Sequence, residues 1–172
     1  MDQELIHTGR RAAEAPSVRR RMPVGFRVAT PQFTVPDVVK AAEYYRDVLG
    51  FEVAGYWDGS EASLRTEPPP VFGIVRRDAV QVFFSLADGS EARSGRAEGA
   101  YDVYFEVADV DALSAELIER GAQIIDGPED RPYGQRELVV ADCHGLVLAF
   151  AEPIEAPPNT RMDGTTGTMA EM

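Results

Sequence analysis

The sequence predicts an α+β fold made of two copies of one β-α-β-β-β module. The phrase Phe-Thr-Val-Pro-Asp-Val at residues 33–38 returns as Phe-Glu-Val-Ala-Asp-Val at residues 105–110. In each copy, alternating apolar residues indicate a half-buried strand, and the Asp that follows is a preferred N-cap of a helix. A strand that enters a helix through a capping Asp, found twice, predicts one domain built from two similar halves.

Length and composition agree with a single globular domain. The chain has 172 residues, of which 44% are apolar and 27% are charged, and this is enough for one sizeable core. We expect the domain at residues 27–153, with modules at about 29–87 and 100–152. Residues 1–26 and 154–172 are uneven and polar, and they predict flexible tails. The first tail is rich in arginine, so a basic arm that docks on its own acidic domain is the alternative interpretation.

The first module follows a clear order of patterns. Apolar residues at helical spacing end at Gly50, which favours a helix C-terminus there. The three prolines at 68–70 argue against a central strand, because proline lacks the N–H that a sheet needs. We expect a strand at 30–35, a helix at 37–49, and strands at 51–57, 61–66, 71–76 and 79–86, followed by a connector at 87–99.

The second module repeats this order. Its helical pattern ends at Gly121, and a turn is expected at Asp142-Cys143-His144-Gly145. Glycine and proline between 127 and 134 favour a loop. We expect a strand at 101–107, a helix at 109–120, and strands at 122–125, 137–141 and 146–151.

Charge and cysteine content exclude several classes of protein. The formal net charge of −12 argues against a nucleic-acid partner and suits a cationic ligand. No apolar run approaches the length of a membrane span, so no membrane partner is expected. Cys143 is the only cysteine, which fits the reducing cytoplasm, our predicted location.

The strand that opens each module should have one apolar face and one polar face. Side chains alternate across a strand, so if Phe33, Val35 and Phe105 pack on the helices, their neighbours point the other way. Those neighbours are too polar for a sealed core, and two curved sheets with such faces predict a cleft. The residues expected on this cleft face are Gln32, Thr34, Asp102, Tyr104 and Glu106.

Further phrases carry a family resemblance. Residues 44–53 read Tyr-Tyr-Arg-Asp-Val-Leu-Gly-Phe-Glu-Val, residues 133–137 read Tyr-Gly-Gln-Arg-Glu, and residues 142–145 read Asp-Cys-His-Gly. Together with the repeat, they resemble the vicinal oxygen chelate superfamily, which includes glyoxalase, extradiol dioxygenases and the bleomycin resistance proteins. The resemblance covers about residues 27–153. It implies paired modules that curl into a cleft, in a homodimer.

The resemblance also implies where a metal would be bound. Metal enzymes of the superfamily carry His or Glu at four slots, which fall here at Thr30, Phe83, Asp102 and Ala149. Of these, Asp102 alone could ligate a cation, whereas a divalent site needs several N or O donors. The chain has two histidines, at His7 in the predicted tail and at position 144 in the predicted turn. We therefore predict no metal and no cofactor.

Two other candidate groups favour structural roles. Cys143 and His144 have the residue types of a nucleophile and its base, but adjacent turn residues point apart. Glu137 beside Arg136 could form an ion pair or a pocket rim. Alternation lets only one of that pair face inward, and the sequence does not say which.

Two functions remain open from the sequence. The first is a binding protein similar to the bleomycin resistance proteins, which holds a small, cationic aromatic molecule in a metal-free cleft and has no catalytic residue. The second is a lyase, isomerase or dioxygenase of the same superfamily with a metal site displaced toward Asp102 or Glu106, or with acid–base residues alone. Cleft aromatics favour the first function, since aromatic faces and carboxylates suit such a ligand. The candidates are Tyr56, Trp57, Phe83 and Tyr104, some of which could equally be core.

Overall fold

The computed structural model describes residues 25, 27–88, 97 and 99–155. Nearly all of the two predicted tails and most of the predicted connector at 87–99 therefore lie outside the described residues. The predictions made for those segments, including the basic arm, stay untested.

Module 1 forms one mixed sheet, sheet A, with a helix on one face. Its strands are ordered β1-β5-β4-β2-β3, with β1 parallel to β5 and the other pairs antiparallel. The predicted short strand at 61–66 is present as a two-residue edge strand. The elements are β1 (Gln32–Val35), α1 (Val38–Asp47), β2 (Glu52–Trp57), β3 (Ala62–Ser63), β4 (Phe72–Arg77) and β5 (Val80–Leu86).

Module 2 repeats the arrangement as sheet B. The strand order β6-β9-β8-β7 corresponds to β1-β5-β4-β2, and β6 is again parallel to its neighbour. The predicted α+β fold of two β-α-β-β-β modules is confirmed. The elements are β6 (Val103–Glu106), α2 (Val110–Glu119), β7 (Gln123–Arg131), β8 (Gln135–Ala141) and β9 (Val147–Pro153).

Both helices begin at the predicted capping residues. The Asp37 carboxylate accepts a hydrogen bond from the Lys40 backbone N–H at 2.9 Å. Asp109 accepts from the Ala112 N–H at 2.8 Å in the same way. Each cap satisfies a donor that the first helical turn leaves unpaired, which is why the repeated phrase marks a strand-to-helix junction.

One element differs from the expectation. We expected a short strand at 122–125 and a loop at 127–134, but β7 continues to Arg131. The strand lies at the edge of sheet B and its register shifts twice between Ile124 and Glu129. An edge strand with such irregularities accommodates Pro128, because the missing N–H faces away from the sheet. The Gly-Pro pair therefore marks an irregular edge strand and not a loop.

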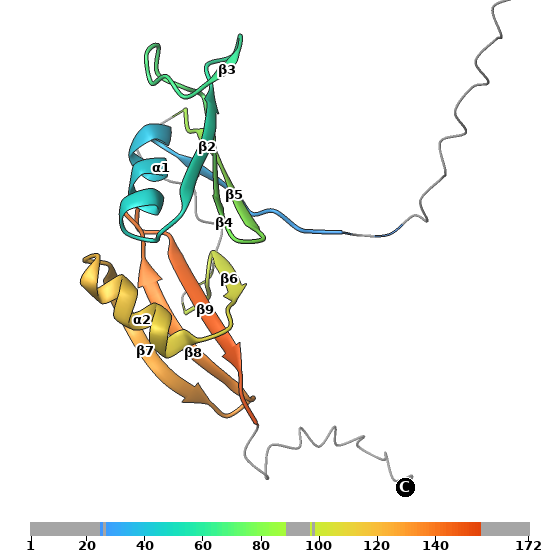
Figure 1. Cartoon of the computed structure of the whole chain (residues 1–172), viewed down its shortest axis with the longest axis vertical. Coiled ribbons are helices and arrows are strands. Elements are labelled where there is room, and N and C mark those ends of the chain that lie inside the picture. The colour runs from blue at the N-terminus through green and yellow to red at the C-terminus, as the bar shows by residue number, and fades with distance from the viewer. Residues whose placement is uncertain (1–24, 26, 89–96, 98, 156–172) are drawn as a thin grey trace, which may run out of the picture.

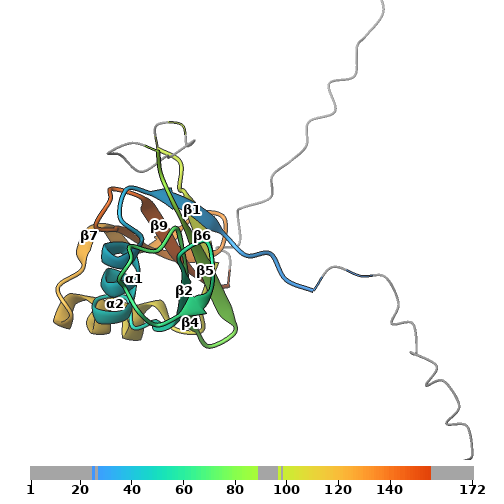
Figure 2. The ribbon, with the colours of Figure 1, turned by 90° about the horizontal axis from the view of Figure 1, so that it is seen from above.

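The two modules share one hydrophobic core, and each contributes a turn that contacts the other module's helix. The modules are stacked along the long axis of the molecule, with α1 and α2 on the same side (Figures 1 and 2). From module 1, Arg77 at the end of β4 donates to Glu116 of α2 at 2.7 Å. From module 2, the Ala141 carbonyl accepts from the Tyr44 hydroxyl at 3.1 Å, and a His144 ring nitrogen lies 3.3 Å from the Asp37 carbonyl oxygen.

Candidate functional site

The opening strands have the two-faced character that alternation predicts. Phe33, Val35 and Phe105 are buried in the core. Gln32, Tyr104 and Glu106 are exposed, while Thr34 and Asp102 are half-buried. Each sheet therefore presents a polar and aromatic face away from its helix. We call these the open face of sheet A and the open face of sheet B.

The open face of sheet A combines aromatic rings with a short polar row. Phe83 lies opposite Gln32 in the register, and its ring centroid is 5.4 Å from that of Phe72. Trp57 is paired with Phe72 across β2 and β4 and is 46% exposed. Directly paired residues share a face, so Trp57 and Phe83 lie on the predicted face. Tyr56 points the other way and is part of the core, so its candidacy as a cleft residue is wrong.

The open face of sheet B is built around Glu137, on the central strand β8. Its side chain is fully buried, and its carboxylate accepts from the hydroxyls of Tyr104 at 2.8 Å and Tyr101 at 3.1 Å. Arg131 donates to it at 3.1 Å, and Tyr133 is a further hydrogen-bond donor. We call these five residues the tyrosine cluster. It places three phenol rings over one carboxylate.

The charges of the tyrosine cluster are fixed by its hydrogen bonds. Burial raises the pKa of Glu137, but hydrogen bonds from the three tyrosines and Arg131 outweigh burial and hold it below its usual value. Burial and the bond to Glu137 raise the pKa of Tyr104. The hydrogen bond with Asp126 is the main reason that the pKa of Arg131 is raised. At neutral pH the cluster is therefore an ionised carboxylate beneath neutral phenols.

Sequence reasoning left most of this cluster unassigned. Of its members, Tyr104 was among the predicted site residues. Alternation required one of Arg136 and Glu137 to face inward, and the structure shows that it is Glu137. Arg136 points to the other side, where it bonds Asp111 and Asp130. The phrase Tyr-Gly-Gln-Arg-Glu at 133–137 was the available signal, since it puts Tyr133 and Glu137 around one hairpin.

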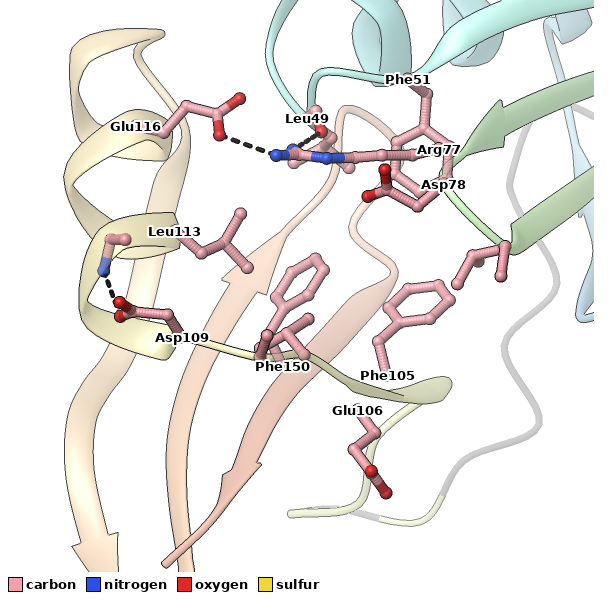
Figure 3. Close-up of a pocket in the computed structure, with 15 residues that line it drawn as sticks. Leu49, Phe51, Arg77, Asp78, Phe105, Glu106, Asp109, Leu113, Glu116 and Phe150 are labelled. Atoms are coloured by element: carbon pink, nitrogen blue, oxygen red, sulfur yellow. Dashed lines mark hydrogen bonds and ion pairs between the residues drawn. The ribbon is translucent and has the colours of Figure 1, made fainter.

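The two predicted acidic anchors have different surroundings. Asp102 accepts a hydrogen bond from the Val147 backbone N–H at 2.8 Å, so it ties the start of β6 to β9. Glu106 is exposed, and Figure 3 shows its carboxylate pointing away from Phe105 and Phe150. Glu106 therefore has the greater freedom to meet a ligand on the open face of sheet B.

The residues at the expected metal slots do not fit a metal. Phe83 pairs with Gln32, and Ala149 pairs with Tyr104, so both slots face the open sides of their sheets as expected. Phe and Ala side chains have no donor atom for a cation. Within the described residues, no three His, Cys, Asp or Glu side chains come together in a way that could hold a metal ion.

The pair Cys143–His144 has a structural environment. Burial, with the nearby Asp142 charge, raises the pKa of the Cys143 thiol to about 11, so the reactive thiolate is disfavoured. The thiol lies 3.9 Å from the Lys40 carbonyl oxygen, and the His144 ring lies against the Asp37 carbonyl. Both side chains therefore contact the start of α1 and tie the two modules together.

A separate cavity lies between the modules, and we call it the hollow (Figure 3). Its volume is about 550 Å³. It adjoins the helix-facing side of sheet B, so it and the open face lie on opposite sides of β6. Of the predicted site residues it includes Glu106 alone, whose carboxylate points away. Its lining residues are Leu49, Phe51, Arg77, Asp78, Ala79, Val80, Phe105, Glu106, Val107, Ala108, Asp109, Ala112, Leu113, Glu116 and Phe150.

Neither helix that the structure describes has both the length and the apolar character needed to cross a membrane.

Comparisons with known proteins agree with the fold. A family model described as the glyoxalase/bleomycin resistance protein/dioxygenase superfamily matches residues 27–150. A search of curated proteins found no match. Among solved structures, a glyoxalase-related enzyme from Clostridium phytofermentans superposes with a TM-score of 0.58 at 18% identity, covering 78% of this chain and all of the other.

Two further solved structures are similar to the chain. TioX from Micromonospora sp. ML1 has a TM-score of 0.55 and 18% identity, over 74% of this chain and all of the other. TnmS3, an antibiotic binding protein from Streptomyces sp. CB03234, has a TM-score of 0.51 and 23% identity, over 77% of this chain and 99% of the other. At these identities the likeness shows a shared fold.

Proposed function

Because the chain belongs to the glyoxalase/bleomycin resistance protein/dioxygenase superfamily, we propose that it binds a small aromatic, positively charged molecule and leaves it chemically unchanged. The observation that carries this proposal is the tyrosine cluster. Tyr104 and Tyr133 are 46% and 49% exposed while their hydroxyls are committed to Glu137. Their ring faces are therefore free to stack on an aromatic or cationic group.

The charge of the open face supports a cationic ligand. Glu106 is exposed beside Tyr104 on β6. Arg131 is already engaged by Asp126, Glu129 and Glu137, so it has little capacity left for an anionic ligand. TnmS3 is an antibiotic binding protein with a similar fold, which supports a binding role.

We further propose that the protein is a homodimer in the cytoplasm, without a nucleic-acid or membrane partner. Each open face carries an exposed aromatic residue, Trp57 on sheet A and Tyr104 on sheet B. A second copy that covers these faces would convert them into closed clefts. Sedimentation velocity at micromolar concentration should show one species of twice the 18.8 kDa chain mass; a single species at the chain mass would contradict the dimer.

The binding proposal is tested by a thermal-shift screen followed by calorimetry. Glycopeptide and cationic aromatic antibiotics are screened with and without a chelator, and the bound compound is recovered and weighed by mass spectrometry. We expect binding that the chelator does not change, and recovery of the intact compound. Turnover that the chelator abolishes would instead identify a metal enzyme. Elemental analysis of the purified protein measures its metal content independently.

Matched variants then locate the ligand. Tyr133→Leu removes an exposed ring, and loss of one stacking contact should weaken binding by about 0.5–1 kcal/mol or more. Glu106→Gln removes the negative charge on β6, whereas Glu119→Gln makes the same change at another exposed position, on α2, and serves as the control. If the two glutamine variants bind equally well, the acid on β6 is not an anchor.

A further inference from the structure

The hollow has the size and the walls of a binding site that is separate from the open faces. Small-molecule sites have volumes of roughly 300–1,000 Å³, and the hollow measures about 550 Å³. Module 1 contributes the corner between α1 and β2 and the turn between β4 and β5. Module 2 contributes β6, the start of α2 and part of β9.

The floor of the hollow is apolar. The rings of Phe105 and Phe150 are stacked, with centroids 5.4 Å apart and an interplanar angle of 25°. Leu113 from α2 points over Phe150, and Leu49 and Phe51 form the opposite wall (Figure 3). Such a surface favours a hydrophobic body, because contact with the floor removes apolar area from water.

The one arginine of the hollow is already engaged. Arg77 donates from Nη1 to the Leu49 carbonyl at 2.6 Å and from Nη2 to Glu116 at 2.7 Å. The backbone at Gly50 approaches the guanidinium so closely that an added Cβ would lie 2.7 Å from Nη1. Arg77 therefore serves as a tie between the modules and does not offer a site for an anion.

A carboxylate is available at the rim. Asp78 occupies the tip of the β4–β5 turn with a left-handed backbone (φ 51°), and Figure 3 shows its carboxylate projecting toward the hollow. Within the described part of the chain, its side chain makes neither a hydrogen bond nor an ion pair. Asp109 adds further negative charge to the lining, whereas the Glu116 carboxylate is already paired with Arg77 and Arg120. The hollow thus combines an apolar floor with an acidic rim.

We propose that the hollow binds an apolar molecule that carries one ammonium group. The hydrophobic body lies on Phe105, Phe150 and Leu113, and the ammonium group pairs with Asp78. Because the walls come from both modules, such a ligand also bridges the modules. This site lies on the opposite side of β6 from the tyrosine cluster, so the proposal can be tested independently of the function proposed above.

Three probes of equal shape and different charge test the proposal on the full chain. They are 4-phenylbutylamine, 4-phenylbutan-1-ol and 4-phenylbutanoate, titrated into protein labelled with ¹³C at its methyl groups. The amine should shift the methyl signals of Leu49, Val80 and Leu113 in a saturable manner. The alcohol and the carboxylate should need about tenfold higher concentration, the effect of one charge-assisted hydrogen bond. Unshifted lining methyls, or equal binding of the three probes, would overturn the proposal.

Three variants sharpen this test. Asp78→Asn keeps a residue type that tolerates positive φ and removes the charge, so amine affinity should fall to that of the alcohol. Asp88→Asn, at an exposed position outside the hollow, should leave the affinity for the amine unchanged. Ala112→Leu fills the hollow from a helical position and should abolish the methyl shifts of all three probes. Full amine affinity in Asp78→Asn, or shifts that persist in Ala112→Leu, would rule the site out.

Discussion

Replacing Glu137 by glutamine should destabilise the protein strongly, although the two side chains have nearly the same shape. The carboxylate is fully buried and accepts from Tyr101, Tyr104 and Arg131 at 2.8–3.1 Å. An amide offers one acceptor oxygen, and its NH₂ group would face the Arg131 Nε–H or a tyrosine hydroxyl. The arginine would then lose its buried partner.

The expected magnitude follows from these contacts. Hydrogen bonds to a buried charged group contribute about 1.5–3 kcal/mol each, and removing one partner of a buried pair costs about 3–5 kcal/mol. Arg131 keeps Asp126 and Glu129 as partners and is partly exposed, which favours the lower end. We expect the free energy of unfolding to fall by about 3 kcal/mol and the melting temperature by about 6–12 °C.

The pH dependence supplies a second readout. The folded state lowers the pKa of Glu137, so the carboxylate stabilises the fold above its unfolded pKa of about 4.3. That contribution is lost as the pH falls through the lower, folded pKa. Between pH 7 and about pH 3, the stability of the wild type should therefore decline more steeply than that of Glu137→Gln.

Urea unfolding followed by circular dichroism measures both effects. Glu129→Gln is the matched control, because Glu129 is an exposed partner of Arg131 and its ion pair should be worth less than about 1 kcal/mol. A Glu137→Gln variant within about 1 kcal/mol of the wild type, or one with an unchanged pH profile, would refute the account of the tyrosine cluster as a buried charge held by its donors.

Further outcomes are expected from the caps, a glycine and the cysteine. Asp37→Ala and Asp109→Ala should each lower the free energy of unfolding, measured with urea, by about 1 kcal/mol. A change below about 0.3 kcal/mol would contradict a stabilising role for the caps. Gly127→Ala should lower the free energy of unfolding by about 3 kcal/mol or more, because an added Cβ at φ 81° collides with a backbone carbonyl of β8. Gly121→Ala, with φ 80° and open space around it, should lower it by about 1–2 kcal/mol. Iodoacetamide should label Cys143 slowly at pH 8 and faster toward pH 11, since its pKa is raised to about 11; labelling at the rate of a free thiol would contradict this environment.

Local patterns in the sequence predicted the fold well because they reflect local physics. The capping carboxylates act within three residues along the chain, and alternation sets the two faces of β1 and β6. Gly127-Pro128 misled the prediction, because the same pair suits a loop and an irregular edge strand. Whether a strand lies at an edge depends on sheet order, which no local pattern records.

The site was predicted less completely because its parts meet through tertiary structure. The tyrosine cluster joins β6 to the β7–β8 hairpin, and Glu137 reaches Tyr104 across 33 positions of sequence. The hollow is formed by the packing of one module on the other, so its residues share no pattern within either module. Alternation along the strand could place Tyr104 and Glu106 on one face, but it could not predict which residues of other strands contact them.

The ties between the modules also constrain the order in which the chain can fold during synthesis. The Tyr44 hydroxyl meets Ala141 and the Asp37 carbonyl meets His144, at separations of 97 and 107 positions. Such contacts close long loops, whose entropic cost must be met before the contacts form. When only the first module has left the ribosome, the turn that contains His144 and contacts the start of α1 has not yet been synthesised. The first helix therefore acquires its final surroundings only after the last hairpin has emerged, and a chain stalled before residue 141 would lack both contacts.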